Sequence, residues 1–98
     1  MTTDLEPIFD QVQGGDPVGA AYRLVQLLGP AAAGKTFYEA GSMALARRDD
    51  LGEGALRFAR IVFAEAVERD PELGEAHHDL ASTMRELGMA QEDRKSTR

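Results

Sequence analysis

The stretch GALRFARIVFAEAVERDP, residues 54–71, decides the fold class of this 98-residue chain. Its apolar side chains recur every third or fourth residue, which is the spacing of one face of a helix. They are Ala55, Phe58, Ala59, Val62, Phe63, Ala66 and Val67. The stripe is wide enough to be covered on two sides, so this helix is predicted to be the central one, ending at Asp70-Pro71.

The same spacing predicts four more helices, separated by short glycine- and proline-rich breaks. They run from Leu5 to Val12, from Pro17 to Leu28, from about Ala31 to Arg48 and from about Leu73 to Leu87, where Gly88 ends the last one. The inward side chains of the second and third are predicted to be Leu24, Val25, Leu27, Leu28, Phe37, Ala40, Met43 and Ala44. No segment has strand alternation or hairpin turns, so we expect an all-α antiparallel stack of about five helices.

The segment GPAAAGKT, Gly29–Thr36, fits the phosphate-loop consensus G-x-x-x-x-G-K-[ST]. In addition, RIVFAE, residues 60–65, looks like the apolar strand and acid that hold magnesium in such enzymes. A phosphate loop needs a buried strand to deliver its glycines to a helix N-terminus. Here the preceding AAYRLVQLLG is predicted to be helical, so we expect a turn between two helices. Nucleotide binding at Gly29–Thr36 is the minor alternative.

Charge and composition bound the class of partner. The net charge of −6 argues against nucleic acid and anionic membranes. There is no cysteine, which excludes disulfides, thiol catalysis and cysteine-ligated metals. The acidic start is unlike a secretory signal, and no apolar run approaches the roughly 20 residues that cross a bilayer. We expect a soluble cytoplasmic protein.

Residues 54–88 have a regular spacing of small and large residues over two predicted helices. The first carries Gly54, Ala59, Phe63, Ala66 and Pro71, and the next carries His77, Leu80, Ala81 and Met84. This spacing resembles the second helix of a tetratricopeptide repeat followed by the first helix of the next repeat. Gly54 and Gly88 are 34 residues apart, which is the family's period. A weaker echo comes from Gly15, Ala20, Leu24 and Leu27.

The resemblance implies a right-handed solenoid of about two and a half repeats over residues 1–89, followed by a polar tail, 90–98. His77 and Met84 stand where the family has aromatic residues, and ALARRDDLGEG has no counterpart in a standard repeat. The alternative is a generic helical bundle that shares the spacing.

The resemblance also implies a protein or peptide partner, held in a concave groove on the first helix of each pair. The matching positions are Lys35, Tyr38, Ser42, His78, Ser82 and Arg85. Lys35 and Arg85 are suited to clamp a carboxylate, and Tyr38 to stack on a side chain. A solvated helix surface is the plainer interpretation of the same residues. The function expected is that of a non-catalytic scaffold or adaptor.

Chemistry has few candidates in this sequence. His77 and His78 are adjacent on a helix and point about 100° apart, so they do not face one metal ion. We expect His77 to pack on the preceding helix pair and His78 to be partly exposed. Glu75 and His78 form one E-x-x-H pair where di-iron bundles need two. We therefore expect no enzyme activity, no metal and no cofactor.

Self-association is the second class of function that the sequence supports. The last predicted helix has no following helix to cover it, and the ends of solenoids need polar caps. An apolar edge made of Leu73, Leu80, Met84 and Leu87 would pair with a second copy or with another protein.

Overall fold

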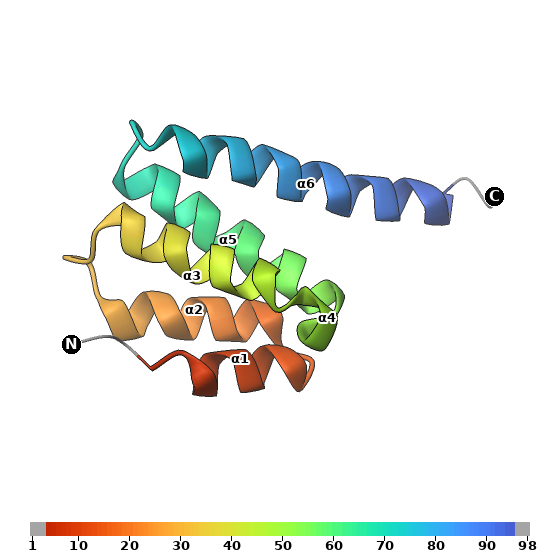
Figure 1. Ribbon diagram of the computed structural model, residues 1–98, viewed down its shortest axis with the longest axis horizontal. Coiled ribbons are helices and arrows are strands. Elements are labelled where there is room, and N and C mark those ends of the chain that lie inside the picture. Colours follow the sequence, from red (N-terminus) through yellow and green to blue (C-terminus); the bar gives the residue numbers. More distant parts are fainter. Residues whose placement is uncertain (1–3, 96–98) are drawn as a thin grey trace.

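The computed structural model of the protein describes the backbone of residues 4–95 and the side chains of residues 4–88. Within this part the chain forms only helices, which confirms the all-α prediction. They are α1 (Glu6–Gln13), α2 (Pro17–Leu28), α3 (Gly34–Ala46), α4 (Arg48–Leu51), α5 (Glu53–Arg69) and α6 (Gly74–Lys95). Figure 1 shows the long helices stacked side by side from α1 to α6, with successive ones running in opposite directions. The shortest extent of 19 Å is about two helix diameters.

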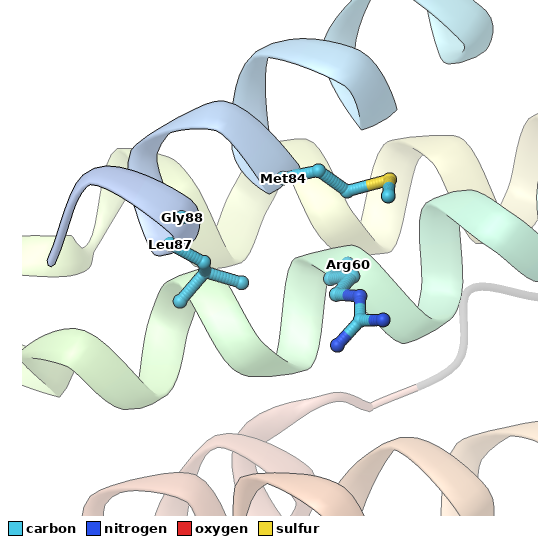
Figure 2. A pocket seen from close by; sticks show the side chains of 4 residues that line it. All are labelled: Arg60, Met84, Leu87 and Gly88. Atoms are coloured by element: carbon cyan, nitrogen blue, oxygen red, sulfur yellow. The ribbon is translucent and has the colours of Figure 1, made fainter. Parts of the chain in front are cut away.

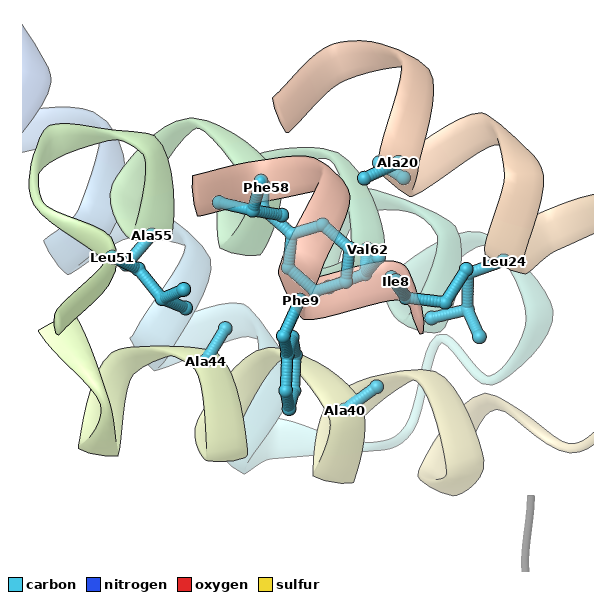
Figure 3. Packing of buried hydrophobic residues seen from close by; sticks show 12 residues of the cluster. Ile8, Phe9, Ala20, Leu24, Ala40, Ala44, Leu51, Ala55, Phe58 and Val62 are labelled. Carbon is cyan, nitrogen blue, oxygen red and sulfur yellow. The ribbon is translucent and has the colours of Figure 1, made fainter. Parts of the chain in front are cut away.

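The central helix is α5, as its wide apolar stripe predicts. It contacts all five other helices. Its buried side chains are Ala55, Leu56, Phe58, Ala59, Val62, Phe63 and Ala66. Figure 3 shows Phe58 of α5 among residues of α1, α2 and α3, and its ring meets that of Phe9 edge to face at 5.9 Å. The core is therefore built around one helix.

Two glycines of α3 let it approach α5 closely. A Cβ on Gly41 would lie 2.5 Å from Cε1 of Phe63, and one on Gly34 would lie 2.6 Å from the carbonyl oxygen of Ala66. Real Cβ atoms do not come so near to other atoms. Because alanine is the better helix former, glycine at these two helical positions is explained by packing rather than by propensity.

Three predicted helix boundaries are wrong. The segment DDLGEG was expected only to break the chain, but its first residues belong to the one-turn helix α4, which makes six helices instead of five. The third long helix begins at Gly34 rather than near Ala31, because Pro30–Ala33 form a turn closed by the Ala32 N–H donating to the Gly29 carbonyl at 3.4 Å. Gly88 does not end α6, which continues to Lys95.

The continuation of α6 has a simple physical reason. A glycine inside a helix costs only about 1 kcal/mol relative to alanine, and Gly88 has no neighbour within 4 Å of the place where a Cβ would stand. Good helix formers on both sides outweigh that cost. The predicted boundary between a domain ending at residue 89 and a tail, 90–98, thus falls inside α6. Residues 96–98 lie outside the described residues.

Two of the predicted inward side chains are exposed. Leu27 is 60% exposed on α2 and Met43 is 49% exposed on α3. Both lie off the face that meets α5, whereas Leu24, Phe37, Ala40 and Ala44 are buried as predicted. In the part of the chain with described placement, no helix is both long and apolar enough to cross a membrane.

Candidate interaction surface

A trough runs along α5 between α2 and α6. Its main hollow has a volume of about 620 Å³ and is open to solvent. The apolar side chains that line it are Val18, Tyr22, Ile61, Ala64, Leu80 and Met84. Three of these are large and well exposed: Val18 at 46%, Tyr22 at 58% and Met84 at 48%. An exposed apolar cluster of this kind marks an interaction site more often than scattered single residues do.

Two smaller hollows adjoin the first one and lengthen the trough. One of about 200 Å³ lies between Arg60, Met84, Leu87 and Gly88, and one of about 80 Å³ lies beside Arg57 and Ile61. Figure 2 shows Leu87 reaching from α6 toward α5, with Arg60 on α5 nearby and Met84 one turn back along α6. Arg60 lines all three hollows, so they form one continuous surface.

The trough carries two charged side chains without partners among the described residues. Arg60 and Glu68 both line the main hollow, and neither makes a hydrogen bond or ion pair within the described part of the chain. Glu65 also lines it but is engaged, because its Oε2 accepts from Nε of Arg69 at 2.8 Å. The free positive and negative charges thus stand two helical turns apart.

The surface predicted from the repeat resemblance lies on α3 and α6, away from this trough. Lys35, His78 and Arg85 are exposed there, and Tyr38 and Ser42 are half-buried, as is Ser82. The two helices are joined by Tyr38, whose hydroxyl donates to Oδ2 of Asp79 at 2.9 Å. Neither Lys35 nor Arg85 is engaged with another described side chain. The ring of Tyr38 packs on that of Phe63, with 5.6 Å between the ring centres, so part of this face is occupied by contacts within the protein.

The hydrogen bond to Asp79 raises the pKa of Tyr38 above its ordinary value of 10.0, and a hydrogen bond with Ser42 acts in the opposite direction. The folded state therefore keeps the phenol proton to higher pH than the unfolded state. The stabilisation is complete below about pH 10 and is lost as the pH rises through the folded-state pKa.

Tyr38→Phe is expected to lower the free energy of unfolding at pH 7 by about 0.5–1.5 kcal/mol, the net worth of one hydrogen bond. It should also reduce the loss of stability above pH 10. Urea unfolding at pH 7 and at pH 10.5 measures both effects. Tyr22→Phe is the matched control, because Tyr22 is 58% exposed and its change should stay within about 0.5 kcal/mol. Equal effects of the two changes would contradict the prediction.

The four residues predicted to form an apolar edge on the last helix do not share one environment. Leu73 packs against the cluster of Phe37, Ala66 and Ala76. Leu87 is only 8% exposed and lines the two smaller hollows, whereas Leu80 and Met84 line the main hollow of the trough. The accessible part of the predicted edge is thus one wall of the trough.

The phosphate-loop-like segment forms the connection between α2 and α3. Gly29 has a φ of +80°, which suits glycine, and no strand precedes it within residues 4–28. Nη1 of Arg69 donates to the carbonyl oxygens of Gly29 and Ala32 at 2.8 and 3.0 Å, and its guanidinium lies 4.5 Å from the centre of the Phe37 ring. The turn is therefore fastened to α5 through its carbonyl groups.

The histidines differ from the prediction in one respect. His77 is exposed instead of packed on the preceding helices, and its Nε2 lies 2.7 Å from the carbonyl oxygen of Pro71. The side chain of His78 is 83% exposed beside Asp79. Across the residues with described side chains, no three groups of the kind that hold a metal ion come together.

Sequence reasoning missed half of the trough. Val18 and Tyr22 are four residues apart and therefore share a face of α2 that lies away from its buried stripe. Ile61 and Ala64 are three residues apart and share a face of α5 that also lies away from its buried side chains. This second apolar spacing, outside the buried stripe of each helix, was the signal that the sequence offered.

Comparisons of the chain with protein-family models, with curated proteins and with solved structures find no match.

Proposed function

We propose that the protein is a non-catalytic interaction module and that the trough over α5 binds a segment of another protein. The observation that carries the proposal is the group of large apolar side chains left open to water around a hollow of about 620 Å³. Covering Val18, Tyr22 and Met84 would remove apolar surface from water, at a gain of roughly 25 cal/mol per Å².

The trough is better suited to binding than the face of α3 and α6. Its floor and both walls come from long helices that pack on each other through the core, so the surface is preformed. A preformed apolar surface loses little conformational freedom on binding. By contrast, Tyr38 on the other face already has a partner in Asp79.

Ala64→Glu is expected to block binding without unfolding the protein. Ala64 is exposed in the middle of the trough floor, so a longer charged side chain fills the hollow while pointing into water. Affinity purification from the native cell extract, followed by mass spectrometry, should recover a partner with the wild-type chain that the variant loses by at least about tenfold. Circular dichroism should show unchanged helix content.

Ala81→Glu is the matched control, since Ala81 is also exposed but lies between His78 and Arg85 on the face of α6 predicted from the resemblance. It should retain the partner. Loss of the partner with Ala81→Glu alone would move the site to α3 and α6 and contradict the proposal. Sedimentation of the purified chain tests self-association: a dimer dissolved by Ala64→Glu would make the partner a second copy.

We further propose that the chain is a divergent member of the tetratricopeptide repeat arrangement. Support comes from Ala59, Phe63 and Ala66, which are buried where the family places its small and large contact residues. The pairs α1–α2 and α3–α5, with α6 following, supply the helix count of two and a half repeats, α4 being an insertion. In that arrangement α2 and α5, which give the trough one wall and its floor, are second helices of pairs, and α6, which gives the other wall, is a first helix.

A further inference from the structure

We infer that the occupant of the trough is an amphipathic α-helix that carries an acidic residue opposite Arg60 and a basic residue opposite Glu68. This inference rests on the proposed function and names the chemistry of its partner. It follows from the apolar floor, the position of the two free charges and the absence of backbone partners along the trough.

The backbone requirement favours a helix. An extended peptide lying on Ile61, Leu80 and Met84 would place its N–H and C=O groups over apolar side chains, and such groups are costly to bury unpaired. Strand addition needs a sheet edge, and residues 4–95 offer none. A helix satisfies its own backbone hydrogen bonds and presents a continuous apolar stripe. The small Ala64 in the floor allows that stripe to approach α5.

The charges specify the partner. Arg60 and Glu68 are eight residues apart, so their backbones lie about 12 Å apart along the axis of α5, at roughly 1.5 Å per residue. An apolar partner would cover both and leave them without compensation, which disfavours binding. A partner helix with opposite charges roughly seven or eight positions apart on its trough-facing side matches both. The guanidinium of Arg60 is suited to a carboxylate, which it can bind through two parallel hydrogen bonds.

A displayed library of helical peptides of about 18 residues tests the inference. Each peptide has a leucine stripe of helical spacing, and the flanking positions vary among Glu, Lys, Gln and Ala. Selection on the wild-type chain should enrich peptides with one acid and one base at the stated separation, in one preferred order. Selection on the Arg60→Glu/Glu68→Arg double variant, which keeps the net charge of −6, should enrich the opposite order.

The measured affinities should follow the same pattern. A peptide selected on the wild-type chain should bind the charge-swapped variant about tenfold more weakly, and exchanging its own two charges should restore binding. The control is Lys35→Glu/Glu39→Lys on α3, which also preserves composition and net charge, and whose two side chains are exposed away from the trough. It should leave affinity and charge order unchanged.

The outcomes separate the inference from the proposed function. If the enriched peptides lose binding to Ala64→Glu but show no charge order, or the same order on both baits, the inference is wrong and the trough remains a binding surface. If the peptides bind Ala64→Glu as well as the wild-type chain, the trough is not their site. Both the inference and the proposed function then fail.

Discussion

Phe63→Ala is expected to lower the free energy of unfolding by about 3–5 kcal/mol, the largest effect of any single change proposed for this protein. The Phe63 ring is fully buried on α5 and packs against Gly41 and the ring of Tyr38, both on α3. Removing it leaves a cavity at the closest helix–helix contact of the core. Since domains of this size are stable by only about 5–15 kcal/mol, urea unfolding followed by circular dichroism resolves the loss easily.

Gly41 makes this prediction specific. Gly41→Ala should itself cost about 1–3 kcal/mol, because the added Cβ would lie 2.5 Å from the Phe63 ring, which is fully buried, and 2.9 Å from Cγ2 of Val62. In the double variant the new methyl group occupies part of the cavity left by the ring. The loss of unfolding free energy in the double variant should therefore be about 1 kcal/mol smaller than the sum of the losses in the two single variants. Strictly additive costs would mean that Gly41 and Phe63 do not meet.

Much of this core is readable from the sequence, for a physical reason. Residues at intervals of three and four occupy one face of a helix, and α5 has such a face on two sides, so Phe58, Val62 and Phe63 are predicted to be buried and are. Helix ends are less predictable, because glycine weakens a helix without forbidding it. Gly88 is passed by α6, whereas Gly29 ends α2 with a φ of +80°.

The second apolar faces of α2 and α5 are visible in the sequence, but the trough that they help to form is not, because it depends on which helices become neighbours. Val18 and Tyr22 of α2 form a surface only because the fold places Ile61 and Ala64 of α5 and Met84 of α6 around the same hollow. Periodicity reports which face of a helix is apolar, but it does not say whether a second apolar face is covered by another element. Of the predicted edge, Leu87 is buried and Met84 is exposed, while Leu73 and Leu80 are both half-buried.

Gly34→Ala is expected to cost about 1–3 kcal/mol of unfolding free energy, at a position where the phosphate-loop consensus also requires glycine. The added Cβ would lie 2.6 Å from the carbonyl oxygen of Ala66 and 2.9 Å from Cβ of Asp70. The first atom belongs to the backbone of α5, and the second is bonded directly to the backbone of Asp70, the residue that follows α5, so neither can turn aside as the end of a flexible side chain would. Relief requires α3 to move away from α5, which loosens the core.

Two further variants test whether the loss of stability comes from the close approach of α3 to α5 and not from replacing a glycine as such. Gly88→Ala, inside α6 and free of neighbours within 4 Å, should instead raise stability by about 0.5–1 kcal/mol through helix propensity. Lys35→Ala should change stability by less than about 0.5 kcal/mol, because Lys35 is exposed and has no partner among the described residues. In a phosphate loop the glycines make room for a ligand, whereas here Gly34 makes room for the carbonyl oxygen of Ala66. A neutral Gly34→Ala would show that α3 and α5 are farther apart than this packing requires, and the packing explanation of the motif would fall with it.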